Sequence, residues 1–253
     1  MSGLPRSSHA LVTGGGRGIG RAVASALVGA GAMVTVVGRH RATLDEAVAA
    51  GHAHFAEVAD VADQAAITSA IANASKRRPI DILVANAGVA ESAPFEKSDA
   101  ALFKRMIGVN LMGVVHAIQA GLPTMKKRPY GRIIAIASTA GLKGYAYVSA
   151  YSAAKHAVVG LVRSLALELA GTRVTVNAVC PGFTDTDLVA TSIDNIMKKT
   201  GRSREQAIAE LSSHNPQGRL VTPAEVADSV LWLCGEGASA ITGQAIVVAG
   251  GEV

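Results

Sequence analysis

Short apolar runs alternate along the chain with longer stretches that are rich in alanine and leucine. Six runs of four or five residues are dominated by β-branched and other apolar side chains, and they occupy residues 10–13, 33–37, 81–85, 132–136, 174–177 and 245–248. Continuous apolar runs of this length are typical of strands that are buried on both faces. A more weakly apolar run, residues 54–57, is a candidate for one further strand.

The stretches between these runs carry the spacing of amphipathic or buried helices, at residues 19–29, 64–75, 101–125, 150–169 and 223–233. Strands that alternate with helices in this way predict an α/β fold. We expect a Rossmann-type doubly wound parallel sheet of about seven strands, with helices on both faces. Because the sequence shows neither internal repeats nor a flexible linker, residues 1–253 are predicted to form a single domain.

One segment, residues 183–220, departs from the regular alternation because it is polar and basic and lies between a predicted strand and a predicted helix. Ligands of open α/β sheets bind beyond the carboxyl ends of the strands, so we interpret this segment as a small lid over the substrate. Its cations either attract the phosphates of CoA or an acidic carrier protein, or form a solvated helix face, and the second interpretation is preferred. These cations are Lys198, Lys199, Arg202 and Arg204.

The composition narrows the class of protein. Hydrophobic residues make up 49% of the chain and charged residues only 17%, which favours a globular domain over a disordered one. The net charge of +5 and the pI of about 9.4 suit an anionic partner. However, aromatic residues make up only 4% and no run of lysine and arginine exceeds three residues, so binding to nucleic acid is not expected.

No segment predicts export or membrane insertion. The first nine residues lack the apolar stretch of a signal peptide, and the uncharged run 22–38 is interrupted by Gly29 and Gly31. Cys180 and Cys234 have neither metal-ligand nor redox spacing, so we expect free thiols and no metal site. These features together predict a cytoplasmic protein without membrane contact.

A glycine-rich turn, TGGGRGIG at residues 13–20, directly follows the first predicted strand and begins the first predicted helix. Glycine permits a left-handed backbone and lets a pyrophosphate approach the N–H groups at the start of a helix. The position of this turn therefore favours dinucleotide binding over a purely structural turn. The residues concerned are Gly14, Gly16, Arg17, Gly18, Ile19 and Gly20.

The spacing of Gly14, Gly18 and Gly20 resembles the Thr-Gly-x-x-x-Gly-Ile-Gly signature of the short-chain dehydrogenases/reductases, which implies a nicotinamide cofactor. Members that prefer NAD(H) place an acidic residue after the second strand, whereas Arg39 follows Gly38 here. A guanidinium can bind the 2′-phosphate of NADP(H) by paired charge-assisted hydrogen bonds, and Arg17 is a second candidate for this role. NADP(H) is therefore expected in preference to NAD(H), which stays an alternative.

Further positions resemble the cofactor contacts of the same family. Asp60 and Val61 match the pair beside the adenine, although Asp60 could instead cap a helix that begins near Ala62. The triplet Asn86, Ala87 and Gly88 matches the family's Asn-Ala-Gly signature, and we expect Asn86 mainly to hold the backbone at the strand end.

The resemblance extends to the turn after the sixth strand. In the family, the backbone after Pro181 and Gly182 contacts the nicotinamide amide, Phe183 lines the ring, and a hydroxyl group follows shortly afterwards. Thr184 is the expected hydroxyl residue and Thr186 is the alternative. A simple turn without a role in binding would carry the same residues.

A set of side chains with proton-transfer chemistry accompanies these turns. Tyr151 and Lys155 are four residues apart on a predicted helix and share one face, where an ammonium group would favour the phenolate form of the tyrosine. Ser138 ends the fifth strand, where its hydroxyl could polarise a carbonyl. Asn110 interrupts an apolar helix and requires a buried partner, and a water held between it and Lys155 would relay protons.

Together, Asn110, Ser138, Tyr151 and Lys155 resemble the catalytic tetrad of the short-chain dehydrogenases/reductases in type, order and spacing. Tyr145 and Tyr147 do not fit the role of the catalytic tyrosine, because neither has a lysine four residues further on.

The segments around Ser138, Tyr151 and Cys180 resemble bacterial β-ketoacyl thioester reductases, 3-hydroxyacyl-CoA dehydrogenases and polyketide ketoreductases. The resemblance implies hydride transfer between NADP(H) and a ketone or secondary alcohol, with a 3-oxoacyl group on CoA or on an acyl carrier protein as substrate. It also implies a homotetramer, in which the apolar helices 101–125 and 150–169 would pack between copies.

Two alternatives stay open at this point. One is an NAD(H)-dependent dehydrogenase of another small alcohol, such as 3-hydroxybutyrate, a polyol or the alcohol of an aryl ketone. The other is a nucleotide-sensing binding module that has lost turnover, although an intact tetrad argues against it.

Overall fold

A parallel sheet of seven strands forms the centre of the computed structural model, which describes residues 3–253. All six strand pairs are parallel, and the strand order is β3-β2-β1-β4-β5-β6-β7. The predicted doubly wound fold is confirmed, including its weakly apolar strand at β3. The strands are β1 (His9–Thr13), β2 (Met33–Gly38), β3 (Phe55–Val58), β4 (Ile82–Ala85), β5 (Gly131–Ile136), β6 (Val174–Pro181) and β7 (Ala245–Val248).

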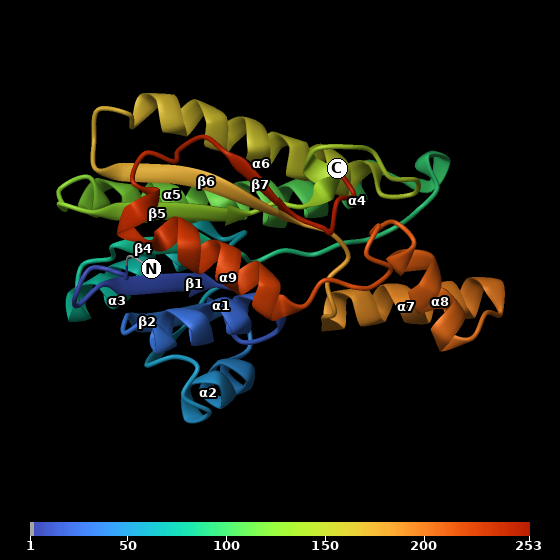
Figure 1. The fold of residues 1–253 in the computed structure, drawn as a ribbon, viewed down its shortest axis with the longest axis horizontal. Helices are drawn as coiled ribbons and strands as arrows, with labels where there is room; N and C mark the ends of the chain where they lie inside the picture. Colours follow the sequence, from blue (N-terminus) through green and yellow to red (C-terminus); the bar gives the residue numbers. More distant parts are fainter. Residues whose placement is uncertain (1–2) are drawn as a thin grey trace.

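Helices cover both faces of this sheet (Figure 1). One apolar layer includes residues of α1 (Gly18–Gly29), α2 (Arg41–Ala49) and α9 (Pro223–Cys234). The opposite layer includes residues of α3 (Gln64–Arg77), α5 (Gly113–Met125) and α6 (Ser149–Glu168).

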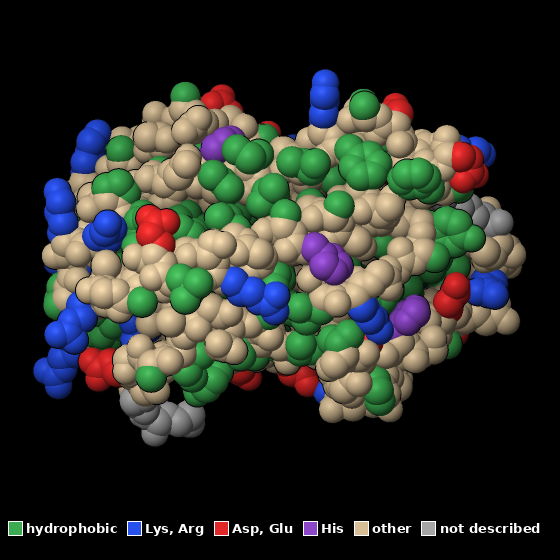
Figure 2. Space-filling view, turned by 90° about the horizontal axis from the view of Figure 1, so that it is seen from above, with side chains coloured by type: hydrophobic (Ala, Val, Ile, Leu, Met, Phe, Trp, Pro, Cys, Tyr) green, Lys and Arg blue, Asp and Glu red, His purple; other side chains and the backbone are tan. Residues whose placement is uncertain are grey.

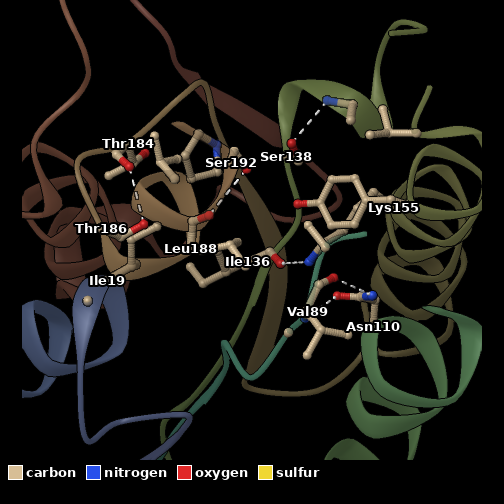
Figure 3. Close-up of a pocket in the computed structure, with 18 of the residues that line it drawn as sticks. Ile19, Val89, Asn110, Ile136, Ser138, Lys155, Thr184, Thr186, Leu188 and Ser192 are labelled. Carbon is tan, nitrogen blue, oxygen red and sulfur yellow. Dashed lines mark hydrogen bonds between the residues drawn. The ribbon is translucent and has the colours of Figure 1, made fainter. Parts of the chain in front are cut away.

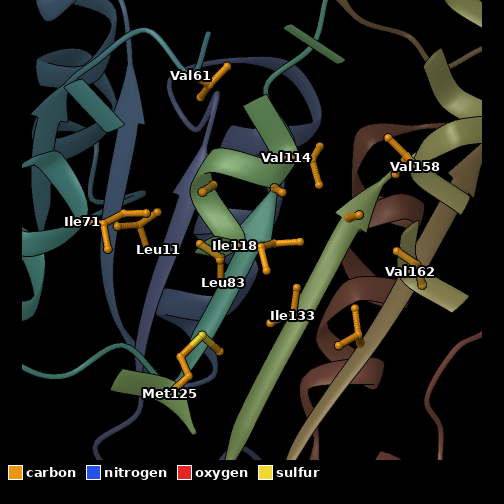
Figure 4. Packing of buried hydrophobic residues seen from close by; sticks show 14 of the residues in the cluster. Leu11, Val61, Ile71, Leu83, Val114, Ile118, Met125, Ile133, Val158 and Val162 are labelled. Carbon is orange, nitrogen blue, oxygen red and sulfur yellow. The ribbon is translucent and has the colours of Figure 1, made fainter. Parts of the chain in front are cut away.

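Neighbouring residues of a strand point to opposite layers, so that a strand with both faces buried needs apolar residues at every position. In β1, Leu11 belongs to the layer of α3, α5 and α6, whereas Ala10 and Val12 belong to the layer of α1 and α9. In Figure 4, Leu83 of β4 and Ile133 of β5 lie close to the side chains of α5. This arrangement explains the continuous apolar runs of the sequence.

The helix predicted at residues 101–125 is interrupted in the structure. It consists of α4 (Ala100–Ile107), a π-helical turn at Gly108–Met112 and α5. The whole stretch is long and apolar enough to cross a membrane by length and composition alone. However, Val114, Ile118 and Met125 are buried in the layer against the sheet (Figure 4), so the stretch is a core element of this fold.

Two helices occupy the segment predicted as a lid, namely α7 (Asp187–Thr200) and α8 (Arg204–Ser212). They extend beyond the carboxyl end of β6 (Figure 1). Their apolar side chains form a cluster separate from the two main layers, made by Val189, Ile193, Ala207 and Leu211. The segment predicted as a lid thus has a small core of its own, which the polar composition of its sequence did not predict.

Several lysine and arginine side chains gather at the end of the molecule opposite the lid (Figure 2). Lys126 caps α5 and Arg77 lies in the last turn of α3. Cations at these positions stabilise helix C-termini. Part of the net positive charge therefore has a structural explanation at a distance from the lid.

Candidate functional site

A cleft of about 1010 Å³ lies at the carboxyl ends of the strands. Figure 3 shows Ser138, Lys155 and Asn110 on one side and Ile19, Thr184 and Thr186 on the other. Because all strands are parallel, their carboxyl ends bring together turns that are far apart in the sequence. Every residue predicted for the site lines this cleft, namely Gly14, Gly16, Arg17, Gly18, Ile19, Gly20, Arg39, Asp60, Val61, Asn86, Ala87, Gly88, Asn110, Ser138, Tyr151, Lys155, Pro181, Gly182, Phe183, Thr184 and Thr186.

The glycine-rich turn requires glycine at several of its positions, of which Gly18 and Gly20 illustrate the two reasons. Gly18 has a φ of +52°, in the left-handed region, and a Cβ at Gly20 would lie 2.2 Å from the carbonyl oxygen of Gly14. The helix that follows, α1, has no side-chain cap on its first N–H groups and no acidic residue in its first turn. Its N-terminus is therefore able to bind an anion in the cleft.

Asn86 fastens the glycine-rich turn to the end of β4. Its Nδ2 donates hydrogen bonds to the carbonyl oxygens of Thr13 (3.0 Å) and Gly14 (3.2 Å). In return, Thr13 Oγ1 accepts hydrogen bonds from the backbone N–H groups of Asn86 (3.0 Å) and Ala87 (3.1 Å). The structural role expected of Asn86 is thus the one observed. The sequence analysis did not predict a role for Thr13 in holding this turn. Its position directly before the first glycine of the turn could have indicated that role.

Two arginines stand at the end of the cleft formed by the glycine-rich turn and β2. Arg39 Nη1 lies 3.9 Å from Asp60 Oδ2, and Arg17 Nη1 lies 3.8 Å from Asp187 Oδ2. All four side chains are at least two-fifths exposed, so these long ion pairs contribute little to stability. Both guanidinium groups therefore stay available to an anion.

Asp60 does not cap the following helix, contrary to the alternative considered for it. It accepts a hydrogen bond from the N–H of Ala62 (2.9 Å) in a local turn. The helix α3 begins only at Gln64, and Asp63 is its cap, accepting from Ala65 (2.9 Å) and Ala66 (3.1 Å). Asp60 is thereby placed beside Arg39 rather than at a helix terminus.

Tyr151 and Lys155 project from the first two turns of α6 toward Ser138, which follows β5. Lys155 is 4% exposed, and its Nζ donates a hydrogen bond to the carbonyl oxygen of Ile136 (2.8 Å; Figure 3). The same Nζ lies 5.7 Å from the centre of the Tyr151 ring. Ser138 Oγ accepts a hydrogen bond from the N–H of Ala140 (3.1 Å), and its hydroxyl is near enough to Tyr151 to act on the pKa of the phenol.

The expected lowering of the Tyr151 pKa by Lys155 is not found. Burial raises the pKa of Tyr151 above its ordinary value of 10.0, and the hydroxyl of Ser138 opposes this effect without reversing it. Burial also lowers the pKa of Lys155 to about 8, because the charged ammonium loses its water. Its Nζ is directed to Ile136 rather than to the phenol. Tyr151 is consequently protonated at neutral pH.

Asn110 is completely buried within the π-helical turn. Its Oδ1 accepts from the N–H of Val89 (3.1 Å), and its Nδ2 donates to the carbonyl oxygens of Val89 (2.9 Å) and Met106 (3.0 Å). The buried partner that the sequence demanded is thus the backbone beyond β4 (Figure 3). A Cβ at Gly88 would lie 2.8 Å from Asn110 Oδ1 and 3.7 Å from Lys155 Nζ, so glycine keeps the space between these two groups open.

Phe183, which was predicted for the site, lines the cleft together with two rings that the sequence did not identify as functional, Tyr145 and His214. The ring centres of Tyr145 and Phe183 are 6.0 Å apart, and His214 lies 5.7 Å from Tyr145 and 5.5 Å from Phe183. Tyr145 donates its hydroxyl hydrogen to the carboxylate of Glu252, and its oxygen accepts a hydrogen bond from Thr139 Oγ1 (2.6 Å). Tyr145 therefore shapes the cleft, although it lacks the lysine of a catalytic tyrosine.

The cations of the segment predicted as a lid are engaged mainly within that segment. Arg202 pairs with Glu210, and Arg204 Nη1 lies 3.8 Å from Asp194 Oδ1. Lys198 is exposed, and the side chain of Lys199 lies outside what the structure describes. The arrangement agrees with the preferred interpretation, a solvated helix face.

Other reactive groups are few in residues 3–253. No three of the described histidine, cysteine, aspartate and glutamate side chains come together as metal ligands. Cys180 and Cys234 are free and buried, as predicted. Burial raises the pKa of Cys180 to about 11, which leaves its thiol protonated at neutral pH.

Comparison with known proteins gives a consistent picture. The family model of the short chain dehydrogenases matches residues 8–196. The chain is 39% identical to a putative ketoacyl reductase of Streptomyces coelicolor over 97% of both chains. It is 36% identical to a D-beta-hydroxybutyrate dehydrogenase of Rhizobium meliloti, over 96% of this chain and 97% of the relative. A crystal structure of an actinorhodin polyketide ketoreductase variant with NADPH is similar, with a TM-score of 0.92 and 38% identity over 97% of both chains.

Proposed function

The chain belongs to the short-chain dehydrogenases/reductases, oxidoreductases of ketones and alcohols, and from this premise we propose that it uses NADP(H) to reduce a 3-oxoacyl thioester. The observation that carries the proposal is the position of Tyr151, Ser138 and Lys155 on one wall of a cleft whose far end holds a glycine-rich turn and Arg39. A proton donor and an anion-binding turn in one cleft are what hydride transfer to a carbonyl requires.

The residues at one end of the cleft fit a phosphorylated dinucleotide. The uncapped N-terminus of α1 suits a pyrophosphate, and Gly20 leaves room for the tight turn before it. Arg39 and Arg17 offer two guanidinium groups for a 2′-phosphate. Phe183 and the backbone at Pro181, on the opposite side, would border the nicotinamide ring. When bound, NADP(H) supplies the hydride for the carbonyl carbon.

The chain's own residues would supply and position the proton. Tyr151 is protonated at neutral pH, because burial raises the pKa of its phenol, and so it would donate the proton to the carbonyl oxygen as that oxygen gains charge. The Ser138 hydroxyl would hold the same oxygen by a second hydrogen bond. A protonated phenol is the form needed for reduction of a ketone.

Lys155, through a water held between it and Asn110, would return a proton to Tyr151 after turnover. The space above Gly88 lies between Asn110 Oδ1 and Lys155 Nζ, and only glycine leaves it open. A water in this space would connect the ammonium with the exterior of the cleft. This supports the proton relay expected from the sequence.

The similar proteins support the proposed substrate class without deciding it. The Streptomyces coelicolor relative is named a putative ketoacyl reductase, and the similar crystal structure contains NADPH. The relative of Rhizobium meliloti is named a D-beta-hydroxybutyrate dehydrogenase, so an NAD(H)-dependent dehydrogenase of a small 3-hydroxy acid is the second candidate.

We further propose a cytoplasmic homotetramer. The free, buried cysteines suit a reducing compartment. Large apolar side chains at the surface offer material for contacts between copies, among them Ile107 (37% exposed), Met112 (38%) and Leu167 (82%). Sedimentation at micromolar concentration is expected to give four times the chain mass, and a monomer would contradict this part of the proposal.

The test is a substrate panel with NADPH and with NADH, in which oxidation of the cofactor is followed by absorbance. Acetoacetyl-CoA and a carrier-bound acetoacetyl thioester are expected to be reduced faster than simple ketones, and NADPH to give the higher kcat/KM. Turnover confined to NADH and a 3-hydroxy acid would favour the second candidate. Tight binding of either nucleotide without turnover of any carbonyl would favour a binding module.

A further inference from the structure

Only one cation stands on the wall of the cleft that Tyr145 and Phe183 form, among the residues that the structure describes. Arg17 and Arg39 lie at the glycine-rich turn and β2, and Lys155 is buried beside Tyr151. The cation near the aromatic group is Lys143, whose Nζ lies 5.1 Å from the centre of the Tyr145 ring.

Lys143 is neutralised by a residue next to the end of the chain. Its Nζ lies 3.2 Å from Glu252 Oε1 and donates to the backbone oxygen of Glu252 (3.3 Å). The Glu252 side chain is only 1% exposed, and the same Oε1 accepts the hydrogen bond of Tyr145. A buried carboxylate with a cation and a phenol as partners is a fixed charge, not a mobile surface group.

The backbone brings Glu252 to this place by a turn that needs glycine. Gly250 and Gly251 have φ values of +62° and +96° and reverse the chain after β7. On its far side, Glu252 Oε2 would lie 2.9 Å from a Cβ at Gly182, which borders the cleft. The carboxylate therefore lies directly behind the wall of the cleft, between Lys143 and the turn that follows β6.

We infer that Glu252 determines the charge of the substrate that the cleft accepts, by cancelling the charge of Lys143. A carboxylate loses its hydration when it enters a cleft, and it needs an uncompensated cation in return. Because Lys143 is paired with Glu252, the wall formed by Tyr145 and Phe183 offers no uncompensated cation. Uncharged 3-oxo esters and thioesters are therefore accepted in preference to free 3-oxo acids. This inference rests on the proposed function, and it separates the thioester reductase from the hydroxy-acid dehydrogenase.

The experiment uses two ketones that differ in one charge, acetoacetate and ethyl acetoacetate, with the full chain and NADPH. The measured quantity is the ratio of kcat/KM for acetoacetate to kcat/KM for the ester, so that a general loss of activity cancels. Wild type is expected to favour the ester. Glu252→Gln leaves a net positive charge and should raise the ratio about tenfold, the size of one charge-assisted hydrogen bond.

Lys143→Met should change the ratio in the opposite direction to Glu252→Gln. It leaves the carboxylate unpaired and should lower the ratio below that of wild type. The double variant Lys143→Met with Glu252→Gln carries no charge at either position, and its ratio should return to within about threefold of wild type, well short of a tenfold gain. The changes should appear in KM for acetoacetate, because the charges act on binding and not on the transferred proton.

The outcomes separate the inference from the function on which it rests. If wild type reduces neither ketone, nor acetoacetyl-CoA, the proposed function is wrong. If wild type reduces the ester but the ratio does not rise in Glu252→Gln and fall in Lys143→Met, the role of Glu252 is wrong while the function stands. Should one single variant fail to fold, the other still gives a ratio of predicted sign, and the double variant still gives a ratio within about threefold of wild type.

Discussion

Replacing Lys155 by methionine is expected to make the cofactor-free protein more stable while it abolishes turnover. Lys155 is 4% exposed, and its ammonium donates to the carbonyl oxygen of Ile136. Burial lowers its pKa to about 8 from the ordinary value of 10.5. Methionine has a similar length and no charge, so Lys155→Met removes the buried charge with little change in volume.

The expected size follows from the lowered pKa. Each pKa unit corresponds to about 1.4 kcal/mol, so holding this charge costs the folded state about 3 kcal/mol. In the variant, the carbonyl oxygen of Ile136 loses its hydrogen-bond donor, which lowers the stability of the variant by about 1 kcal/mol. We therefore expect the variant to be more stable than wild type by about 2 kcal/mol at pH 7.

The sign of the pH dependence follows from the same values. Because the folded-state pKa is lowered, the cost is complete below pH 8 and disappears as the pH rises toward 10.5, the ordinary value. Wild type should thus gain stability relative to Lys155→Met between pH 8 and pH 10. The advantage of the variant should shrink over the same range.

Urea unfolding of the cofactor-free proteins at pH 7 and at pH 9.5 measures both effects. Lys104→Met serves as the control, since Lys104 is an exposed lysine of α4 and its loss should change stability by less than about 0.5 kcal/mol. A Lys155→Met protein that is less stable than wild type at pH 7, or whose stability difference is the same at both pH values, would show that the buried charge of Lys155 does not cost the folded state stability.

Three further predictions concern the cofactor end of the cleft and the helix beside it. Arg39→Ala should weaken NADPH binding about 10- to 100-fold and leave NADH binding nearly unchanged in a fluorescence titration, and equal weakening of both would exclude a 2′-phosphate contact. Gly20→Ala should weaken binding of both nucleotides at least about tenfold, because the new Cβ would lie 2.2 Å from the carbonyl oxygen of Gly14. Unchanged binding in the same titration would contradict the proposal that this turn binds the nucleotide. Asp63→Ala should lower the free energy of unfolding by about 1 kcal/mol and Asp60→Ala by less, and the reverse order in urea would restore Asp60 as the helix cap.

The parts of the fold that depend on local pattern could be predicted from the sequence. Each strand buried on both faces leaves a continuous apolar run, and the glycine-rich turn and the Tyr151–Lys155 spacing are local signals. The helix α2 escaped prediction because it buries only Leu44 and Ala47 and shows little apolar periodicity. The two lid helices escaped because their apolar residues serve a small separate cluster within a polar sequence.

The parts that depend on contacts distant in the sequence could not be predicted. Glu252 and Tyr145 are 107 positions apart in the sequence, and no local pattern predicts their contact. The apolar spacing of residues 101–125 likewise gives no sign of the π-helical turn at Asn110. That turn places the buried amide of Asn110 against the backbone of Val89, a contact between segments that are apart in the sequence. The pKa of Tyr151 was expected to fall, and it rises because burial, which the sequence does not give, outweighs the effect of its neighbours.

The most direct test of the account is the loss of a single oxygen atom in Tyr151→Phe. We expect this variant to bind NADPH as tightly as wild type in a fluorescence titration, yet to reduce acetoacetyl-CoA at least about 1000-fold more slowly, because the proton donor is gone. If the variant retains most of the wild-type rate, Tyr151 does not donate the proton and the proposed chemistry of this cleft is wrong.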